Sequence, residues 1–262
     1  MPFGLINVGA TFQRAMDIAF RGLINKSVVV YLDDITVYSK IRKEHIPHLK
    51  AIFERCRRYG ISLNPKKSIF AMEEGTLLGF VISPEGITID PGRVEAIKAI
   101  VLPHNKKAMQ SFLGKINFMR RFISDFAEIV KPLQEMIKKD ANFKWSKERK
   151  EAFDKIKEAI AEAPTLRSPN FDNEFILYIF ASDHSIASVL TQKNEDGEEF
   201  TVSFMSTGLQ GAELKYPAID KQAFVVFKAV KHFRPYLLRS HTKVIVPHTA
   251  VRALLIQKEP RD

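Results

Sequence analysis

Two adjacent carboxylates, Asp33 and Asp34, have the residue type and spacing that could do chemistry. They stand between two β-favouring runs, Val28–Leu32 and Ile35–Tyr38, which predicts a hairpin with both acids at its tip. Neighbouring carboxylates in an apolar hairpin repel each other unless water or a cation offsets the repulsion. Mg²⁺ prefers carboxylate oxygens, and two such ions about 3.5–4 Å apart commonly serve nucleotidyl transfer. Asp-Asp is also an ordinary turn dipeptide, so the pair alone leaves both interpretations open.

For the other reactive side chains, the sequence pattern favours a structural or surface role. His45 and His48 have helical spacing but no evident third ligand, so we expect surface histidines. Cys56 lies on the apolar side of a predicted helix and is expected in the core. Asp125 and Glu128 are interpreted as helix-surface charges. The sequence contains no convincing Ser-His-Asp arrangement and no phosphate-cradling glycine-rich loop.

The elements that must position the acid pair are mixed. Apolar periodicity predicts helices over Ala10–Phe20 and His45–Arg58, the second ended by Gly60. Two short strands are predicted further along, Leu77–Ile82 and Gly86–Ile89, around a turn sequence. The first part of the chain therefore predicts both helices and strands.

From Arg93 to Ala163 the pattern becomes helical. An amphipathic helix is predicted from an apolar stripe formed by Met109, Phe112, Leu113, Ile116, Met119 and Ile123. The stripe has a basic flank whose residues lie mostly off it: Lys106, Lys107, Lys115, Arg120 and Arg121. Ala127–Lys139 is predicted as the next helix, and Ser146 can cap a third with Phe153, Ile156 and Ile160 on its buried side. This part therefore predicts a small helical subdomain.

Beyond Pro164 the strand pattern returns. Strands are predicted at Phe175–Phe180, Ile186–Gln192, Phe200–Met205 and Lys243–Val246. A helix is predicted from Pro217, with apolar residues at Ala223, Val226, Phe227 and Val230, and a last helix from about Ala250. This α/β order predicts a domain boundary near residue 165.

Composition and charge narrow the class. The chain has 262 residues, 45% hydrophobic and 27% charged, which is typical of folded globular proteins. Of the net charge of +10, residues 1–163 carry +9, from 28 basic and 19 acidic residues. This excess favours a polyanion partner, although a solubilising surface would have the same composition. The single cysteine excludes internal disulfides, and no membrane or secretory stretch is evident, so a reducing intracellular compartment without membrane contact is expected.

Several short motifs occur in a fixed order along the chain. They are Met-Pro-Phe-Gly-Leu-Ile-Asn at 1–7, Ala-Thr-Phe-Gln at 10–13, Tyr-Leu-Asp-Asp at 31–34, Leu-Asn-Pro-Lys-Lys at 63–67, Leu-Leu-Gly-Phe-Val at 77–81, Ser-Phe-Leu-Gly at 111–114 and Ala-Pro-Thr-Leu at 163–166. In this order they resemble the reverse transcriptases of gypsy-type long-terminal-repeat retrotransposons over nearly the whole chain. The resemblance implies an α+β fold with a partial palm at 1–90, a helical thumb and linker at 91–164, and an α/β ribonuclease H-like domain at 165–262.

The resemblance also implies roles for individual residues. Asp33 and Asp34 would be two of three carboxylates that bind Mg²⁺, two ions in the complete site, during RNA-templated DNA synthesis from deoxynucleoside triphosphates. Lys67, or in second place Lys66, would lie near the triphosphate, with Phe3 and Gly4 under the incoming nucleotide and template. The primer end would be held by Leu78, Gly79 and Phe80. The RNA–DNA hybrid backbone would be tracked by Lys106, Lys107, Lys115, Arg120 and Arg121.

Two departures from the family pattern alter the expected activity. The family's first catalytic aspartate lies upstream of the Pro-Phe-Gly-Leu motif, where this sequence begins, so we expect the chain alone to be an inefficient polymerase that needs the rest of the Pol polyprotein. The three ribonuclease H acids are replaced by Phe180, Gln222 and Pro247, which cannot bind Mg²⁺. Residues 165–262 are therefore expected to form a degenerate, connection-type domain.

Three hypotheses follow. The first is a reverse transcriptase fragment with a non-catalytic ribonuclease H-like domain, inactive alone. The second is a nucleic-acid-binding or structural remnant without enzymatic activity. The third keeps an active nuclease through Asp183 and Asp220, which lie near the replaced positions but are offset from them.

Overall fold

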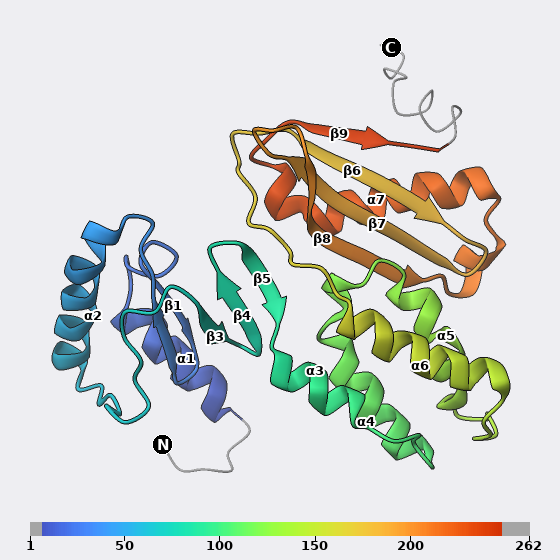
Figure 1. Ribbon diagram of the computed structural model, residues 1–262, viewed down its shortest axis with the longest axis horizontal. Helices are drawn as coiled ribbons and strands as arrows, with labels where there is room; N and C mark the ends of the chain where they lie inside the picture. The colour runs from blue at the N-terminus through green and yellow to red at the C-terminus, as the bar shows by residue number, and fades with distance from the viewer. Residues whose placement is uncertain (1–6, 248–262) are drawn as a thin grey trace. The chain divides into compact units, whose positions relative to one another are not determined.

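The computed structural model describes residues 7–247, and the chain divides into two compact units, Met1–Met72 and Glu73–Asp262. Both units mix helices and strands (Figure 1), which confirms the α+β class. Within residues 7–247, no helix has the length and apolar composition that crossing a membrane requires.

The first unit is built around a two-stranded hairpin. Its elements are α1 (Val8–Ala19), β1 (Val28–Tyr31), β2 (Asp34–Val37), the 3₁₀ turn η1 (Arg42–Glu44) and α2 (His45–Tyr59). The predicted hairpin and both predicted helices are confirmed. Gly60 ends α2 with a φ of +66°, a left-handed conformation that glycine adopts without steric cost. The core of this unit contains Met16, Ala19, Phe20, Val28, Ile52 and Cys56.

The second unit begins with a three-stranded antiparallel sheet. It consists of β3 (Gly75–Leu77), β4 (Phe80–Ser83) and β5 (Gly86–Ile89) in that order. The prediction of one strand over 77–82 was wrong, because a tight turn at Leu78–Gly79 separates β3 from β4. Both turn residues have positive φ, +53° and +79°, as a type I′ hairpin turn requires.

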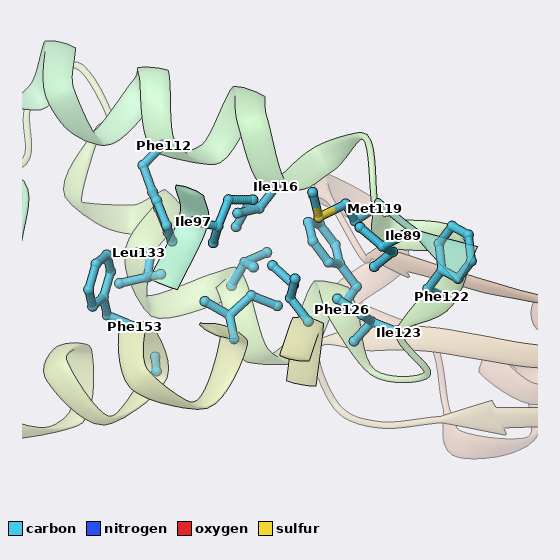
Figure 2. Close-up of a cluster of buried hydrophobic side chains, with 14 of the residues drawn as sticks. Ile89, Ile97, Phe112, Ile116, Met119, Phe122, Ile123, Phe126, Leu133 and Phe153 are labelled. Atoms are coloured by element: carbon cyan, nitrogen blue, oxygen red, sulfur yellow. The ribbon is translucent and has the colours of Figure 1, made fainter. Parts of the chain in front are cut away.

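Helices follow this sheet and enclose a core. They are α3 (Pro91–Lys98), α4 (Lys106–Asn117), η2 (Arg120–Phe122), α5 (Phe126–Met136) and α6 (Lys147–Ala161). Figure 2 shows Phe112 and Ile116 of α4 pointing toward Leu133 of α5 and Phe153 of α6. Ser146 caps α6 by accepting a hydrogen bond from the Arg149 N–H, as predicted. The predicted stripe is buried apart from half-buried Leu113, but α4 ends at Asn117, so Met119 and Ile123 enter the core from the segment that follows it.

The last described part is a four-stranded sheet with one helix. Its elements are β6 (Phe175–Ala181), β7 (Ser185–Lys193), β8 (Glu199–Gly208), η3 (Gly211–Lys215), α7 (Ala218–Leu237) and β9 (Thr242–Ile245). The strand order is β8-β7-β6-β9, antiparallel except for the parallel β6–β9 pair. Helix α7 packs against β6 and β7 (Figure 1). The predicted strands and the helix start are confirmed.

Of the four apolar residues named for the helix α7, Val226 is buried and Ala223 is half-buried. Phe227 and Val230 are exposed, whereas Val225, Ala229 and Phe233 are buried against Phe175, Leu177 and Ile179 of β6. The helix carries apolar residues on more than one face, so its periodicity alone did not identify the face that the sheet covers. The helix predicted from Ala250 lies outside the described residues.

The second unit is continuous from the β3–β5 sheet to β9. Ile89 of β5 lies in the core of the helices, and Phe204 of β8 packs against the same core. Leu166 pairs with Ile87, which ties the linker to β5. The expected domain boundaries at residues 90 and 164 stay a prediction.

Candidate functional site

The acid pair lies at the tip of the β1–β2 hairpin. The register pairs Tyr31 with Asp34, so Leu32 and Asp33 form a two-residue turn and Asp34 begins β2. Leu32 has a φ of +53°, an uncommon conformation for a branched residue that needs support from its surroundings. Asp33 and Asp34 are both exposed. The hairpin therefore presents two adjacent carboxylates to solvent.

Gln13 of α1 supports this turn. Its Oε1 accepts a hydrogen bond of 2.7 Å from the Leu32 N–H, and its Nε2 donates to the Val30 carbonyl at 3.3 Å. The same Nε2 lies 3.0 Å from Asp17 Oδ1, which orients the amide along the helix. The Gln13 side chain thus bonds to the main chain on both sides of Tyr31, at Val30 and at Leu32. Gln13 belongs to the Ala-Thr-Phe-Gln motif, but no local pattern indicates this role, because the partner atoms lie 17 and 19 residues away.

Carboxylate oxygens suit a hard divalent cation, so Asp33 and Asp34 fit such an ion in ligand type. They are only two, however, and within residues 7–247 no group of three or more His, Cys, Asp or Glu side chains could hold a metal ion. The described residues therefore do not assemble a complete two-ion centre by themselves.

The remaining candidates of the first unit lie on its surface or in its core. Lys67 is exposed in a turn after α2, where its N–H donates to the Asn64 carbonyl. Phe3 and Gly4 lie outside the described residues. The Nδ1 atoms of His45 and His48 both contact Ser39 Oγ, at 3.2 and 2.7 Å. Cys56 is buried, as predicted, and this burial raises the pKa of its thiol.

The Leu78–Gly79–Phe80 segment forms the β3–β4 turn of the second unit. The ring of Phe80 stacks on Phe118, with centroids 4.4 Å apart and an interplanar angle of 9°. Phe80 also contacts Phe122 at 5.3 Å between centroids. Aromatic packing therefore fixes this turn against the helical part of the unit.

The five predicted backbone-contacting residues are not equivalent. Lys107 and Lys115 are exposed. Lys106 Nζ instead donates to the carbonyls of Lys138 and Lys139, at 2.7 and 3.1 Å. A guanidinium nitrogen of Arg120 donates to the Ser206 carbonyl at 2.5 Å. Arg121 is half-buried, and its Nε has no hydrogen-bond partner among the described residues.

The replaced nuclease positions carry no ligating side chain. Phe180 lies in β6 and is 54% exposed, Gln222 is in the second turn of α7, and Pro247 follows β9. The buried Oε1 of Gln222 has no hydrogen-bond partner among the described residues. An amide and two apolar side chains thus stand where the resemblance implies acids.

The offset acids Asp183 and Asp220 do not form a metal cluster in the described part of the chain. Lys221 is buried, and its Nζ donates to the Asp183 carbonyl at 3.0 Å and lies 3.9 Å from Asp183 Oδ1. The Lys221 ammonium therefore lies beside the exposed carboxylate of Asp183.

Glu128 is more than the surface charge predicted from sequence. Its Oε2 accepts hydrogen bonds from Ser182 Oγ at 3.0 Å and Ser185 Oγ at 2.5 Å, at the turn between β6 and β7. Burial alone would raise the pKa of Glu128, but these two hydrogen bonds, with Lys131 and His184 nearby, lower it below the ordinary value. The interaction joins α5 to the sheet, and no local sequence pattern indicates it.

Comparisons with known proteins agree with this architecture. Residues 1–82 match the family described as reverse transcriptase (RNA-dependent DNA polymerase). Residues 145–244 match the RNase H-like domain found in reverse transcriptase. The chain therefore contains a reverse transcriptase domain and an RNase H-like domain. Enzymes of this family generally use divalent metal ions.

The curated relatives are transposon polyproteins. The retrovirus-related Pol polyprotein from transposon 297 of Drosophila melanogaster is 36% identical over 99% of this chain, and the transposon Tf2-3 polyprotein of Schizosaccharomyces pombe is 30% identical over 90%. The chain spans 24% and 18% of their lengths, respectively. The chain thus corresponds to the reverse transcriptase and RNase H-like part of these polyproteins.

Solved structures agree as well. The foamy viral protease-reverse transcriptase dRH in complex with double-stranded DNA has a TM-score of 0.82 and 26% identity, over 99% of this chain and 45% of that one. The foamy viral protease-reverse transcriptase in complex with an RNA/DNA hybrid has a TM-score of 0.78 and 25% identity, over 100% of this chain and 36% of that one.

Proposed function

We propose that this chain supplies two metal-binding carboxylates, Asp33 and Asp34, and a nucleic-acid grip to an RNA-directed DNA polymerase. The observation that carries the proposal is the exposed Asp33–Asp34 tip, supported by Gln13 through the Leu32 N–H. The match of residues 1–82 to the reverse transcriptase family supports it. RNA-templated DNA synthesis from deoxynucleoside triphosphates would be the reaction of the complete enzyme.

Mg²⁺ is the proposed ion because both ligands are carboxylates. Asp33 and Asp34 would hold it together with a third acid that residues 7–247 do not provide. Lys67 would lie near the triphosphate, and Phe3 and Gly4 under the incoming nucleotide. The chain alone is therefore proposed to be an inefficient polymerase.

The proposed partner is a primer–template duplex or an RNA–DNA hybrid. Solved relatives in complex with double-stranded DNA and with an RNA/DNA hybrid support this choice, as does the net charge of +9 over residues 1–163. Leu78, Gly79 and Phe80 would contact the primer end. Exposed Lys107 and Lys115 would contact backbone phosphates, whereas Lys106 and Arg120 bond mainly to carbonyls within the protein.

The RNase H-like domain is proposed to be non-catalytic. Phe180, Gln222 and Pro247 offer no carboxylate, and Asp183 lies beside the Lys221 ammonium. A domain of this kind would serve as a structural support for the helices that pack on it.

A second candidate is a nucleic-acid-binding remnant without enzymatic activity. The incomplete acid set of the described residues favours it. Both candidates require binding of the hybrid and differ in whether Asp33 and Asp34 ever take part in synthesis.

The test is primer extension on an RNA template with Mg²⁺ or Mn²⁺, combined with binding of the same labelled hybrid. The wild-type chain is compared with the Asp33→Asn/Asp34→Asn double variant. We expect salt-sensitive binding by both proteins, at most weak extension by the wild type and none by the double variant. Adding a Pol segment that contains the upstream acid should then restore extension by the wild type but not by the double variant.

Two results would contradict the proposal. If the wild-type chain does not bind the hybrid at low salt, it has no nucleic-acid-binding surface. If the supplemented double variant extends the primer as well as the supplemented wild type, Asp33 and Asp34 are not metal-binding carboxylates of the polymerase site.

A further inference from the structure

The turn between β3 and β4 lies against a cationic side chain, Arg93, in the first turn of α3. The Cζ atom of Arg93 lies 4.7 Å from the centre of the Phe118 ring, whose other partner is Phe80. A Cβ atom built on Gly79 would lie 2.4 Å from that same Cζ atom. The absence of a side chain at Gly79 therefore lets the guanidinium approach the turn, and Phe118 orients it.

The hydrogen-bonding groups of this guanidinium are free within the described part of the chain. Arg93 is exposed. Within residues 7–247 only its main-chain N–H donates a hydrogen bond, to Asp90, and none of the ion pairs there includes its guanidinium. Arg120, in contrast, donates to the Ser206 carbonyl, and Arg149 donates to the Lys144 carbonyl. The nearby Asp90 carboxylate accepts instead from the main-chain N–H groups of Gly92 and Arg93.

A guanidinium in this state suits a phosphate. Its planar fork forms two parallel hydrogen bonds to phosphate oxygens, and an orientation that is already fixed reduces the entropy lost on binding. Stacking on Phe118 keeps the charge at the surface without neutralising it. Contacts of this type position a duplex without reading its sequence.

We propose that Arg93, oriented by Phe118 and Gly79, binds a backbone phosphate of the duplex at the Leu78–Gly79 turn. The proposal rests on the proposed nucleic-acid-binding function and adds a residue that the motifs did not indicate. A free nucleoside triphosphate would offer the same phosphate chemistry. The backbone is the proposed source, because the turn belongs to the segment assigned to the primer.

The test is fluorescence anisotropy of an end-labelled RNA–DNA hybrid at several salt concentrations with the full chain. Arg93→Ala should weaken binding about 5- to 10-fold and reduce the slope of log K against log salt by about 0.9, the value for one lost phosphate contact. Arg93→Lys should keep the slope and weaken binding about 2- to 3-fold, because an ammonium lacks the planar fork. Phe118→Leu should also keep the slope and weaken binding, because the charge remains but is no longer oriented.

Arg239→Ala is the matched control. Arg239 is another exposed arginine, stacked 5.3 Å from the centre of the Phe171 ring in the RNase H-like domain, and its loss should change neither affinity nor slope. Competition with excess unlabelled deoxynucleoside triphosphate separates the two phosphate sources. If the triphosphate displaces the hybrid from the wild type but not from Arg93→Ala, the assignment to the backbone is wrong.

The failure of this inference can be distinguished from failure of the proposed function. If the wild type binds the hybrid with a salt-dependent affinity and Arg93→Ala binds with the same affinity and slope, the Arg93 contact does not exist, while the proposed function stands. If the wild type does not bind at all, both fail.

Discussion

The Asp33–Asp34 hairpin and the RNase H-like sheet differ in their acidic residues and in the size of the core that supports them. The hairpin keeps two carboxylates at an exposed tip, supported by four paired residues on each strand and the amide of Gln13. The sheet β6–β9 keeps an extensive apolar core against α7, yet its expected acid positions carry Phe180, Gln222 and Pro247. One region presents the proposed metal-binding acids on a two-stranded hairpin. The other has a large apolar core but no carboxylate at the three positions where the resemblance implies acids.

This difference shows that a core and a site respond to different physical demands. A core tolerates any side chains that fill its volume with the right apolar periodicity. A metal site fails when a few oxygen ligands are lost, even if the surrounding fold is unchanged. In the RNase H-like domain the sheet and α7 still pack together. The sheet also holds α5, because Ser206 Oγ accepts a hydrogen bond from the Ala127 N–H and Ser185 Oγ donates one to Glu128.

The largest expected effect concerns the core of the RNase H-like domain. Phe233→Ala should lower the free energy of unfolding by about 3–5 kcal/mol, because this fully buried ring fills the space between α7 and the sheet. Phe180→Ala, at a 54% exposed position of the same domain, should change it by less than about 1 kcal/mol. Urea unfolding measures both, and equal losses would mean that Phe180 is part of the core.

The next effect concerns the acid pair. Asp33→Asn/Asp34→Asn should weaken Mn²⁺ binding by at least about tenfold, because even partners that only support metal ligands typically contribute that much. Asp183→Asn/Asp220→Asn is the matched control in the other region and should leave Mn²⁺ affinity unchanged, since Asp183 lies beside Lys221. Titration followed by Mn²⁺ electron paramagnetic resonance measures both. The reverse result would mean that the RNase H-like domain holds the ion.

A smaller effect is expected at the support of the acid pair. Gln13→Ala should cost about 1 kcal/mol of unfolding free energy and speed hydrogen exchange at the Leu32 amide, because that N–H loses its acceptor. Thr11→Ala, at an exposed position of the same helix, is the control and should leave Leu32 exchange unchanged. Unaltered exchange in Gln13→Ala would show that the turn does not need the amide.

The smallest expected effect is the pH dependence of the Glu128 contact. Because the pKa of Glu128 is lowered in the folded chain, its contribution is fully present above the ordinary glutamate pKa of about 4.3 and is lost as the pH falls through the folded value. NMR titration of the Ser182 and Ser185 amides should follow this protonation. Glu128→Gln should remove the titration, and a wild-type midpoint above the ordinary value would contradict the assignment.

Regular elements were the most predictable part of the fold. Strong periodicity located α2 and the strands β6 to β8, because long runs repeat the same signal. Helix α3 was missed although Asp90 and Pro91 form a capping sequence at its start. The turn at Leu78–Gly79 was missed because a leucine with positive φ is uncommon, and only the pairing of β3 with β4 requires it.

The candidate site was predictable only where chemistry depends on neighbouring residues. Asp33 and Asp34 are adjacent in sequence and stand between two β-favouring runs, so a hairpin with both acids at its tip could be predicted. Gln13 acts on atoms 17 and 19 residues away, and Glu128 on hydroxyls 54 and 57 residues away. Contacts across such distances depend on tertiary packing, which no local pattern encodes.

We expect this chain to bind nucleic acid through residues outside a non-catalytic RNase H-like domain. The most direct measurement is cleavage of the RNA strand of a labelled RNA–DNA hybrid by the full chain, with Mg²⁺ and with Mn²⁺, under conditions where binding is verified by anisotropy. We expect a bound hybrid whose RNA strand stays intact with either ion. Metal-dependent cleavage that disappears in Asp183→Asn would contradict it, because the offset acids would then form a working nuclease site.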